Sequence, residues 1–279
     1  MLWRSFKKPS KMVAVVVPGY AREEFTSDEE ISLRHIEHFL EPYDKYLVVP
    51  KGLKINRPAF RIVGVDQRFF GSPTASTRLM LSPSFYERFA DYKYILLCHL
   101  DALVLSDRLE EWCDLGLDYI GAPWITCGDS PYVKRERVGN GGFSLRKVES
   151  FLRVIYSNQY WVEPDAYWRS VCSQHPGLSS YRFLLKRYMK SFSVFNGARR
   201  EMASWHLRTD GRKNEDYFWA DEAVRYYPPF KVASVEVGLR FAFEVSPRRC
   251  FELNQGNLPF GCHAWPLYDR AFWEPYLLK

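Results

Sequence analysis

The sequence predicts an α/β protein with an open, mostly parallel sheet flanked by helices. Short, continuous runs of apolar and largely β-branched residues are stopped by turn residues, which is typical of buried strands. A helical stretch separates the first two of these runs, as in an open α/β sheet. The chain has 279 residues, with no internal repeat and no low-complexity linker. Residues 1–279 are therefore expected to form a single domain.

The first strands and helix follow each other closely. Residues 12–17 are six apolar residues ended by Pro18-Gly19, which predicts a central strand. Within residues 32–40 the apolar side chains recur on one helical face. Residues 46–49 and 60–65 then predict two further strands.

The middle of the chain contains the strongest strand prediction. A helical stretch over residues 77–92 leads into residues 94–105, which are almost entirely apolar. Residues 117–123 predict one more short strand. Residues 138–145 form a glycine-rich turn that runs into a strand or helix.

The second half is expected to be helical first and extended later. Residues 150–213 are helical in pattern and rich in aromatic and basic residues, and residues 233–245 resemble a strand. Arg182, Lys186 and Lys190 recur every fourth residue, with aromatic and aliphatic side chains away from them. A solvated face on a packed helix is the favoured interpretation. Docking on an anionic membrane surface is the alternative.

Composition narrows the classes of protein and partner. The chain is 47% hydrophobic and 26% charged, which fits a globular protein. Its net charge of +6 suits anionic ligands or an anionic membrane. No dense basic arm or DNA-binding motif is present, so we expect no nucleic acid partner. The 47 aromatic residues exceed what a core alone requires, so some are expected to line a groove for flat rings.

The cysteine pattern and the N-terminal residues predict the cellular compartment of the protein. None of the six cysteines forms a CxxC pair, and Cys98 lies in an apolar run that suits a buried free thiol. The basic extension over residues 1–11 lacks the apolar core of a signal peptide, and no apolar run reaches 18 residues. We expect a cytoplasmic protein, with peripheral membrane contact left open.

Asp101 is the first candidate for chemistry. A carboxylate within an apolar strand is costly unless it is paired or binds a metal. At the end of a strand in an open α/β sheet it would point into the ligand crevice. His99, two residues earlier, would lie on the same face of the strand. The alternative is an Asp that caps a turn or pairs with an Arg.

Three further groups of residues are candidates for a functional site, and each has a structural alternative. The glycine turn at Asn140, Gly141 and Gly142 could approach a ligand closely, or could be a plain tight turn. Glu215 and Asp216 could begin a helix, or supply a general base for a hydroxyl. His263 lies in an aromatic, turn-rich tail, where a structural role is the default.

The order of these signals resembles a known family. Together they look like the nucleotide-sugar-dependent glycosyltransferases of the GT-A fold, and more narrowly a bacterial and viral group, the DUF5672 family. The motifs that carry the resemblance are residues 99–105, 118–124, 139–146, 214–218, 240–244 and 259–265. It spans residues 12–265 and implies a single Rossmann-like, open, twisted sheet.

The resemblance also implies roles for individual residues. It implies a donor site made by Pro18, Gly19, Tyr20, Arg78, His99, Asp101, Asn140, Gly141 and Gly142. The metal-binding Asp-x-Asp motif of these enzymes is here His99-Leu100-Asp101, with only the last Asp present. Asp101 and His263 would bind Mn²⁺ or Mg²⁺. Asp216 would be the general base, with Glu215 orienting it.

The implied reaction moves a sugar from a nucleotide diphosphate, a UDP-sugar being favoured, to an acceptor hydroxyl. A glycan or lipid-linked glycan is the expected acceptor, within polysaccharide biosynthesis, and inversion of the anomeric centre is favoured. Trp161, Tyr167 and Trp168 would shape the acceptor side or simply pack. The alternative is a non-catalytic carbohydrate- or nucleotide-binding protein on the same fold. A nucleotidyltransferase is disfavoured, because the glycine-rich N-terminal loop of that class is missing.

Overall fold

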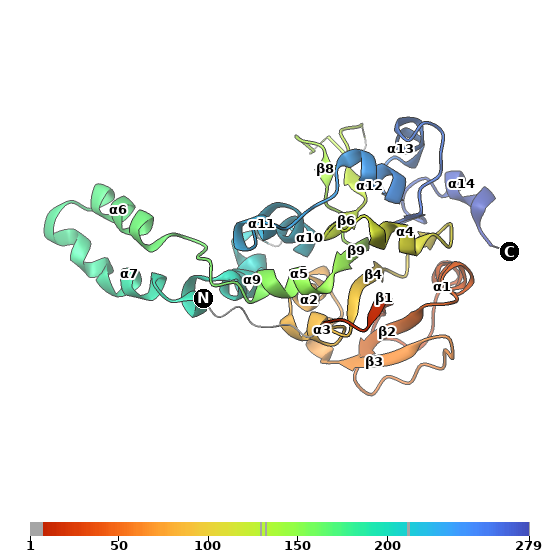
Figure 1. Ribbon diagram of the computed structural model, residues 1–279, viewed down its shortest axis with the longest axis horizontal. Helices are drawn as coiled ribbons and strands as arrows, with labels where there is room; N and C mark the ends of the chain where they lie inside the picture. Colours follow the sequence, from red (N-terminus) through yellow and green to blue (C-terminus); the bar gives the residue numbers. More distant parts are fainter. Residues whose placement is uncertain (1–7, 129, 132, 211–212, 279) are drawn as a thin grey trace.

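A computed structural model describes residues 8–128, 130–131, 133–210 and 213–278. Most of the expected N-terminal extension, residues 1–7, lies outside this part, as do residues 211–212 of the expected helical segment. The described chain forms a sheet-centred body from which a helical arm projects (Figure 1).

A six-stranded sheet with the order β3-β2-β1-β4-β9-β6 forms the centre of the body. The strands β3, β2, β1 and β4 are parallel, and β9 runs antiparallel to both of its neighbours. The mostly parallel α/β sheet expected from the sequence is therefore confirmed. The strands are β1 (Lys11–Pro18), β2 (Asp44–Pro50), β3 (Arg61–Val65), β4 (Tyr92–Cys98), β6 (Tyr119–Gly121) and β9 (Phe143–Lys147).

Both faces of the sheet are covered, which explains why β1 is apolar without a break. Its Ala14 and Val16 face one core, and Val15 and Val17 face the other. One face packs against α2 (Pro73–Met80), α3 (Pro83–Glu87), α5 (Val148–Ile155) and α9 (Ala198–Arg208). The other packs against α1 (Ser27–Phe39), α4 (Leu109–Asp114) and α12 (Val235–Phe241).

Two elements differ from those expected from the sequence, one because a proline interrupts a helix and one because a serine caps a helix. The helix expected over residues 77–92 is broken into α2 and α3, because Pro83 cannot continue a helix from Ser82. The strand expected over residues 233–245 is wrong. Ser234 accepts a hydrogen bond from the Val237 N–H and begins α12, so only β10 (Ala242–Phe243) is extended.

The apolar run at residues 94–105 is not one strand. β4 ends at Cys98, residues 99–102 turn, and β5 (Leu103–Val104) enters a second, three-stranded sheet with the order β10-β11-β5. Asp101 therefore lies in the turn rather than inside a strand. The strand β11 is Gly261–Cys262, and a separate pair is formed by β7 (Pro123–Trp124) and β8 (Arg137–Val138).

The segment expected to be helical, residues 150–213, is helical but largely projects from the body (Figure 1). The prediction of one basic helix around Arg182, Lys186 and Lys190 is wrong. Residues 182–195 instead contain the end of the 3-10 helix η2, the helix α7 and most of the short helix α8. Beyond α5 and α9, the helices of this segment are α6 (Pro164–Gln174), η2 (Gly177–Phe183), α7 (Leu184–Lys190) and α8 (Ser193–Asn196).

The remaining helices surround the body. They are η1 (Gln67–Phe69), α10 (Glu215–Tyr217), η3 (Phe218–Glu222), α11 (Ala223–Tyr226), α13 (Pro247–Leu253), α14 (Arg270–Trp273) and η4 (Glu274–Tyr276). All six cysteines are free, and Cys98 is buried as expected. Across the described ranges, no helix has the length and apolar character to cross a membrane.

Candidate active site

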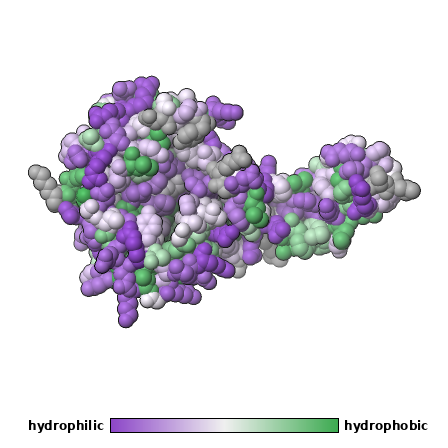
Figure 2. Space-filling model, turned by 180° about the vertical axis from the view of Figure 1, so that it is seen from behind, coloured by the Kyte–Doolittle hydropathy of each residue, from purple (hydrophilic) through white to green (hydrophobic). Residues whose placement is uncertain are grey.

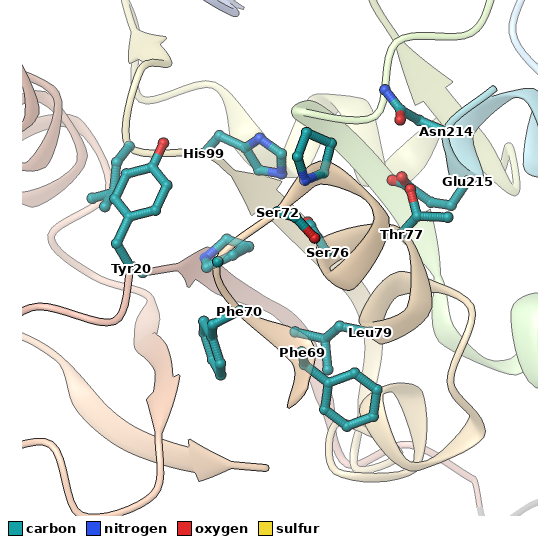
Figure 3. A pocket seen from close by; sticks show the side chains of 15 residues that line it. Tyr20, Phe69, Phe70, Ser72, Ser76, Thr77, Leu79, His99, Asn214 and Glu215 are labelled. Atoms are coloured by element: carbon teal, nitrogen blue, oxygen red, sulfur yellow. The ribbon is translucent and has the colours of Figure 1, made fainter. Parts of the chain in front are cut away.

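A cavity of about 470 Å³ opens at the carboxyl ends of β1 and β4. These strands are parallel neighbours, so their ends meet at one edge of the sheet, where ligands bind in open α/β folds. Its volume is in the range of small-molecule sites. The residues lining it include Pro18, Gly19, Tyr20, Phe69, Phe70, Ser72, Ser76, Thr77, His99, Asn214 and Glu215 (Figure 3).

A cluster of His99, Asp101 and His263 stands at the end of β4, and its potential ligand atoms lie within 4.8 Å of one another. The turn after β4 presents His99 and Asp101, with the Ala102 N–H donating to the His99 carbonyl at 3.0 Å. The strand β11 pairs antiparallel with β5 and so delivers His263 to the same place. His263 Nε2 lies 3.4 Å from Asp101 Oδ1.

The cluster is suited to a divalent metal. His99 Nε2 is buried and finds no hydrogen-bond partner within the described chain. An unsatisfied buried nitrogen of this kind is costly, and a metal ion would satisfy it. Burial, aided by the charge of His263, lowers the pKa of His99 to about 4, so its ring is neutral and able to ligate. The structure thus adds His99 to the expected ligands Asp101 and His263.

Glu244 contacts His263 at the ring nitrogen that points away from Asp101. Its Oε1 accepts a hydrogen bond from Asn140 Nδ2 at 2.6 Å and lies 2.9 Å from His263 Nδ1. Burial alone would lower the pKa of His263, but the Asp101 and Glu244 carboxylates raise it to about 10, so the ring is protonated at neutral pH and a metal ion would have to displace its Nε2 proton. The contact of Glu244 with Nδ1 orients the ring so that Nε2 faces Asp101. Sequence reasoning assigned Glu244 no role, although a carboxylate between apolar neighbours was a usable signal.

The same residues act on Asp101. Burial would raise the pKa of this carboxyl, but His263 and His99 hold it below its usual range. Asp101 is therefore ionised at neutral pH and available to a cation.

The glycine turn is required by close packing. A Cβ on Gly142 would lie 2.0 Å from His263 Nε2, and one on Gly141 would lie 2.7 Å from Glu215 Oε1. Neither glycine has a positive φ, so space rather than backbone conformation demands them. Asn140 Oδ1 accepts a hydrogen bond from the Gly142 N–H at 3.0 Å and holds the turn in place.

Glu215 and Asp216 form α10, directly before the π-helical turn η3. Glu215 lines the cavity and pairs at 3.1 Å with Arg146, which is fully buried and also donates to the Gly141 carbonyl. Asp216 is buried beside them. Burial, reinforced by the charges of Glu215 and Glu244, raises the pKa of Asp216 well above its usual value. A carboxylate so placed binds a proton strongly.

An aromatic clamp holds the far side of α10. The rings of Trp124 and Tyr217 stack with centroids 4.4 Å apart, and the Arg137 guanidinium lies 4.5 Å from the Trp124 ring. Arg137 also pairs with Asp221 of η3 through two hydrogen bonds, of 2.8 and 3.0 Å. The β7–β8 pair is thereby fixed to the segment that carries Asp216. Nothing in the sequence pattern had singled out Tyr217 or Arg137.

Comparison with known families identifies the chain. A model of the family described as "Protein of unknown function (DUF5672)" matches residues 59–263. The chain belongs to the DUF5672 family. The matched range contains all of the cluster described above, from His99 to His263. A search of the curated proteins finds no match.

Solved structures similar to this DUF5672 protein include two glycosyltransferases. One is involved in the glycosylation of the major capsid of PBCV-1, with 11% identity over 95% of this chain and 98% of that chain and a TM-score of 0.46. Another is the galactosyltransferase LgtC in complex with donor and acceptor sugar analogs, with 12% identity over 90% and 86% and a TM-score of 0.47.

Some expected site residues of this DUF5672 protein lie elsewhere. Arg78 is exposed on α2, outside the residues that line the cavity, and its Nη2 lies 2.9 Å from His206 Nε2. Trp161, Tyr167 and Trp168 do not line the cavity either. Their rings contact cations of the arm and α9: Arg208 for Trp161, Lys190 for Tyr167 and Arg187 for Trp168. Their proposed part in acceptor binding stays a prediction.

Proposed function

We propose that this protein is a glycosyltransferase that moves a sugar from a nucleotide diphosphate to an acceptor hydroxyl. One observation carries the proposal: His99, Asp101 and His263 converge, with an unpartnered imidazole nitrogen, beside a cavity at the carboxyl ends of parallel strands. Such an edge is where open α/β proteins bind nucleotides. The cavity would take the nucleotide and the cluster would face its diphosphate.

His99, Asp101 and His263 would hold a divalent metal. Bound there, the metal would neutralise the negative charge that develops on the departing diphosphate. Two imidazoles and one carboxylate suit Mn²⁺ better than Mg²⁺, which prefers oxygen ligands. Glu244 would keep His263 oriented for that role, through its contact with Nδ1.

The donor would lie with its nucleobase near Tyr20 and the turn at Pro18 and Gly19. Tyr20 is half exposed at the cavity, with the Arg22 guanidinium 5.2 Å from its ring centroid, and the exposed part of the ring would stack on a flat base. A UDP-sugar is the proposed donor, on the resemblance of the motifs. The turn at Gly141 and Gly142, which packs against His263 and Glu215, would lie beside the donor sugar.

Asp216 is the proposed general base, with Glu215 held beside it by Arg146. A general base must be ionised before it accepts the proton of the acceptor hydroxyl, and the buried, like-charged surroundings that raise the pKa of Asp216 make its ionised form a stronger base. Attack on the face opposite the diphosphate would invert the anomeric centre. A glycan or lipid-linked glycan hydroxyl, in polysaccharide biosynthesis, is the proposed acceptor. A cytoplasmic location stays a prediction.

Release of a nucleotide diphosphate tests the proposal. The protein is incubated with UDP-, GDP- and dTDP-sugars and Mn²⁺, and the diphosphate is measured. We expect release with one donor, and a loss of at least about 100-fold in Asp101→Asn. Tight donor binding with no release from any donor, with or without glycan acceptors, would instead support the alternative of a non-catalytic binding protein.

Asp216→Asn separates the proposed base from a structural residue. Turnover should fall by about 100-fold or more while donor binding is kept. Because the folded protein raises the pKa of Asp216, ionising it above about pH 4 works against folding. The Tm of the variant should therefore equal or exceed that of the wild type at pH 8, and this advantage should shrink toward pH 4. Near-normal turnover would exclude Asp216 as the base.

A further inference from the structure

The projecting arm, residues 164–196, comprises α6, η2, α7 and α8 and carries an unusual share of exposed apolar surface (Figure 1). The described residues include 18 large hydrophobic side chains that are exposed, and eight of them fall within 15 residues of this arm. Those eight are Tyr181, Leu184, Leu185, Tyr188, Met189, Phe192, Val194 and Phe195. A cluster of this kind marks an interaction surface rather than scattered exposure.

The helix α7 is turned with its apolar side outward. Leu184, Leu185, Tyr188 and Met189 occupy one arc of the helix, and all four are exposed. The opposite arc is basic and faces α6: Lys190 lies 5.8 Å from the Tyr167 ring centroid and Arg187 lies 5.1 Å from that of Trp168. An amphipathic helix of a globular protein normally buries its apolar side against the core. The exposed apolar arc of α7 therefore indicates a binding surface for another molecule.

The neck of the arm is fixed. Asn196 is buried, and its side chain accepts from the Val162 N–H and donates to the Val162 and Lys190 carbonyls. The Trp161 N–H donates to the Asn196 carbonyl at 2.7 Å. These hydrogen bonds join the two ends of the arm to each other, so the base of the arm is ordered.

The charge of the arm indicates which partner. Its five basic residues, Arg169, Arg182, Lys186, Arg187 and Lys190, oppose one acidic residue, Asp165, which makes a net charge of +4 out of +6 for the whole chain. Two such arms would repel each other, which disfavours a second copy of the chain. Lys186 and Arg187 border the apolar arc on its two sides, as in helices that lie at an anionic lipid surface. Figure 2 shows hydrophobic and hydrophilic side chains interleaved along the arm.

We propose that this arm docks on an anionic lipid surface, with the apolar arc of α7 and the exposed rings of Phe192 and Phe195 at the level of the headgroups. Tyr181 and Tyr188 suit that level, because the ring of each is apolar and its hydroxyl tolerates water. Arg182 and Lys186 would contact the acidic headgroups. The inference does not depend on the proposed reaction, since docking requires no donor.

Vesicle flotation tests the proposal on the full chain. We expect binding to phosphatidylcholine vesicles that contain phosphatidylserine, little binding to phosphatidylcholine alone, and release at high salt. Arg182→Glu/Lys186→Glu should lower the partition coefficient by at least about tenfold. Leu185→Ser/Tyr188→Ser should lower it similarly, because both side chains are more than half exposed (70% and 65%).

Matched variants on the body provide the controls. Lys51→Glu/Lys54→Glu makes the same charge change, and Leu115→Ser/Leu267→Ser removes two other exposed apolar side chains. Both should bind vesicles like the wild type. Binding that is absent at low salt, or that falls equally in arm and body variants, would overturn the proposal. So would self-association in sedimentation velocity that Leu185→Ser/Tyr188→Ser abolishes without vesicle binding, since a second copy would then cover the arc.

Discussion

At the scale of single residues, the site depends on side chains from distant parts of the chain that meet within a few ångströms. His99 and Asp101 come from the turn after β4, His263 follows β11, and Glu244 follows β10. Asp101 and His263 were predicted as ligands from their residue types and motifs. Glu244 was not predicted, because only the folded chain brings its carboxylate to His263 Nδ1.

Gly142→Ala tests the packing of this cluster. The added methyl would overlap the His263 ring, so the ring must move away from Asp101 and His99. We expect a loss of about 1–3 kcal/mol in the free energy of unfolding, and Mn²⁺ affinity lower by about tenfold or more, as for displaced ligand supports. Urea unfolding and Mn²⁺ titration calorimetry measure the two effects. Gly128→Ala is the control, since among the described residues, its chain neighbours aside, no atom lies within 4 Å of the added Cβ. An equal effect there would contradict the packing argument.

At the scale of elements, the apolar runs of the sequence predicted where strands lie more accurately than they predicted where those strands begin and end. Residues 12–17 and 46–49 became β1 and β2, because strands covered on both faces are apolar throughout. Residues 94–105 form two strands of different sheets, and residues 233–245 are mostly helix. A continuous apolar run does not distinguish strand from buried helix, and tertiary contacts decide.

The β7–β8 clamp is an element whose role can be tested. Arg137→Ala removes the pair with Asp221 and the contact with the Trp124 ring. The partly exposed pair and the ring contact together should cost about 1 kcal/mol of stability. A loss of about 1 kcal/mol would leave most of the protein folded, so it would hardly change turnover. We expect a clear fall in turnover because Asp216 directly precedes Tyr217, and loss of the clamp would displace both. Arg108→Ala breaks the exposed pair with Glu111 away from the site, and its turnover and Tm should match those of the wild type. Equal turnover in both variants would show that the clamp does not position Asp216.

At the scale of the whole molecule, the proposed metal joins segments far apart in the sequence. A ligand that binds only the folded state stabilises it by mass action. Residues 99–101 and 263 come together only in that state, so metal binding should be visible as thermal stability of the entire body.

Mn²⁺ addition should therefore raise the Tm. At a free Mn²⁺ concentration of about 100 times Kd the expected gain is about 2.7 kcal/mol, or roughly 5–10 °C for a chain of this size. EDTA should reverse the shift, as measured by differential scanning calorimetry. His99→Ala should abolish most of it, whereas Asp107→Ala, on the exposed surface nearby, should leave it intact. A shift that persists in His99→Ala would remove His99 from the ligand set.

The sequence by itself determined the α/β class, the central strands, the family motifs and the candidates Asp101, Asp216 and His263. These depend on local pattern and residue type, which a linear chain displays. His99 was also predicted to share a site with Asp101. Only the tertiary structure decided that His99 Nε2 has no partner in the described chain and lies beside His263, that Glu244 contacts His263, that Arg78 lies outside the cavity and that α7 exposes its apolar arc. Each of these depends on distances between segments far apart in the chain, and those distances are set by the packing of both sheet faces rather than by any local preference.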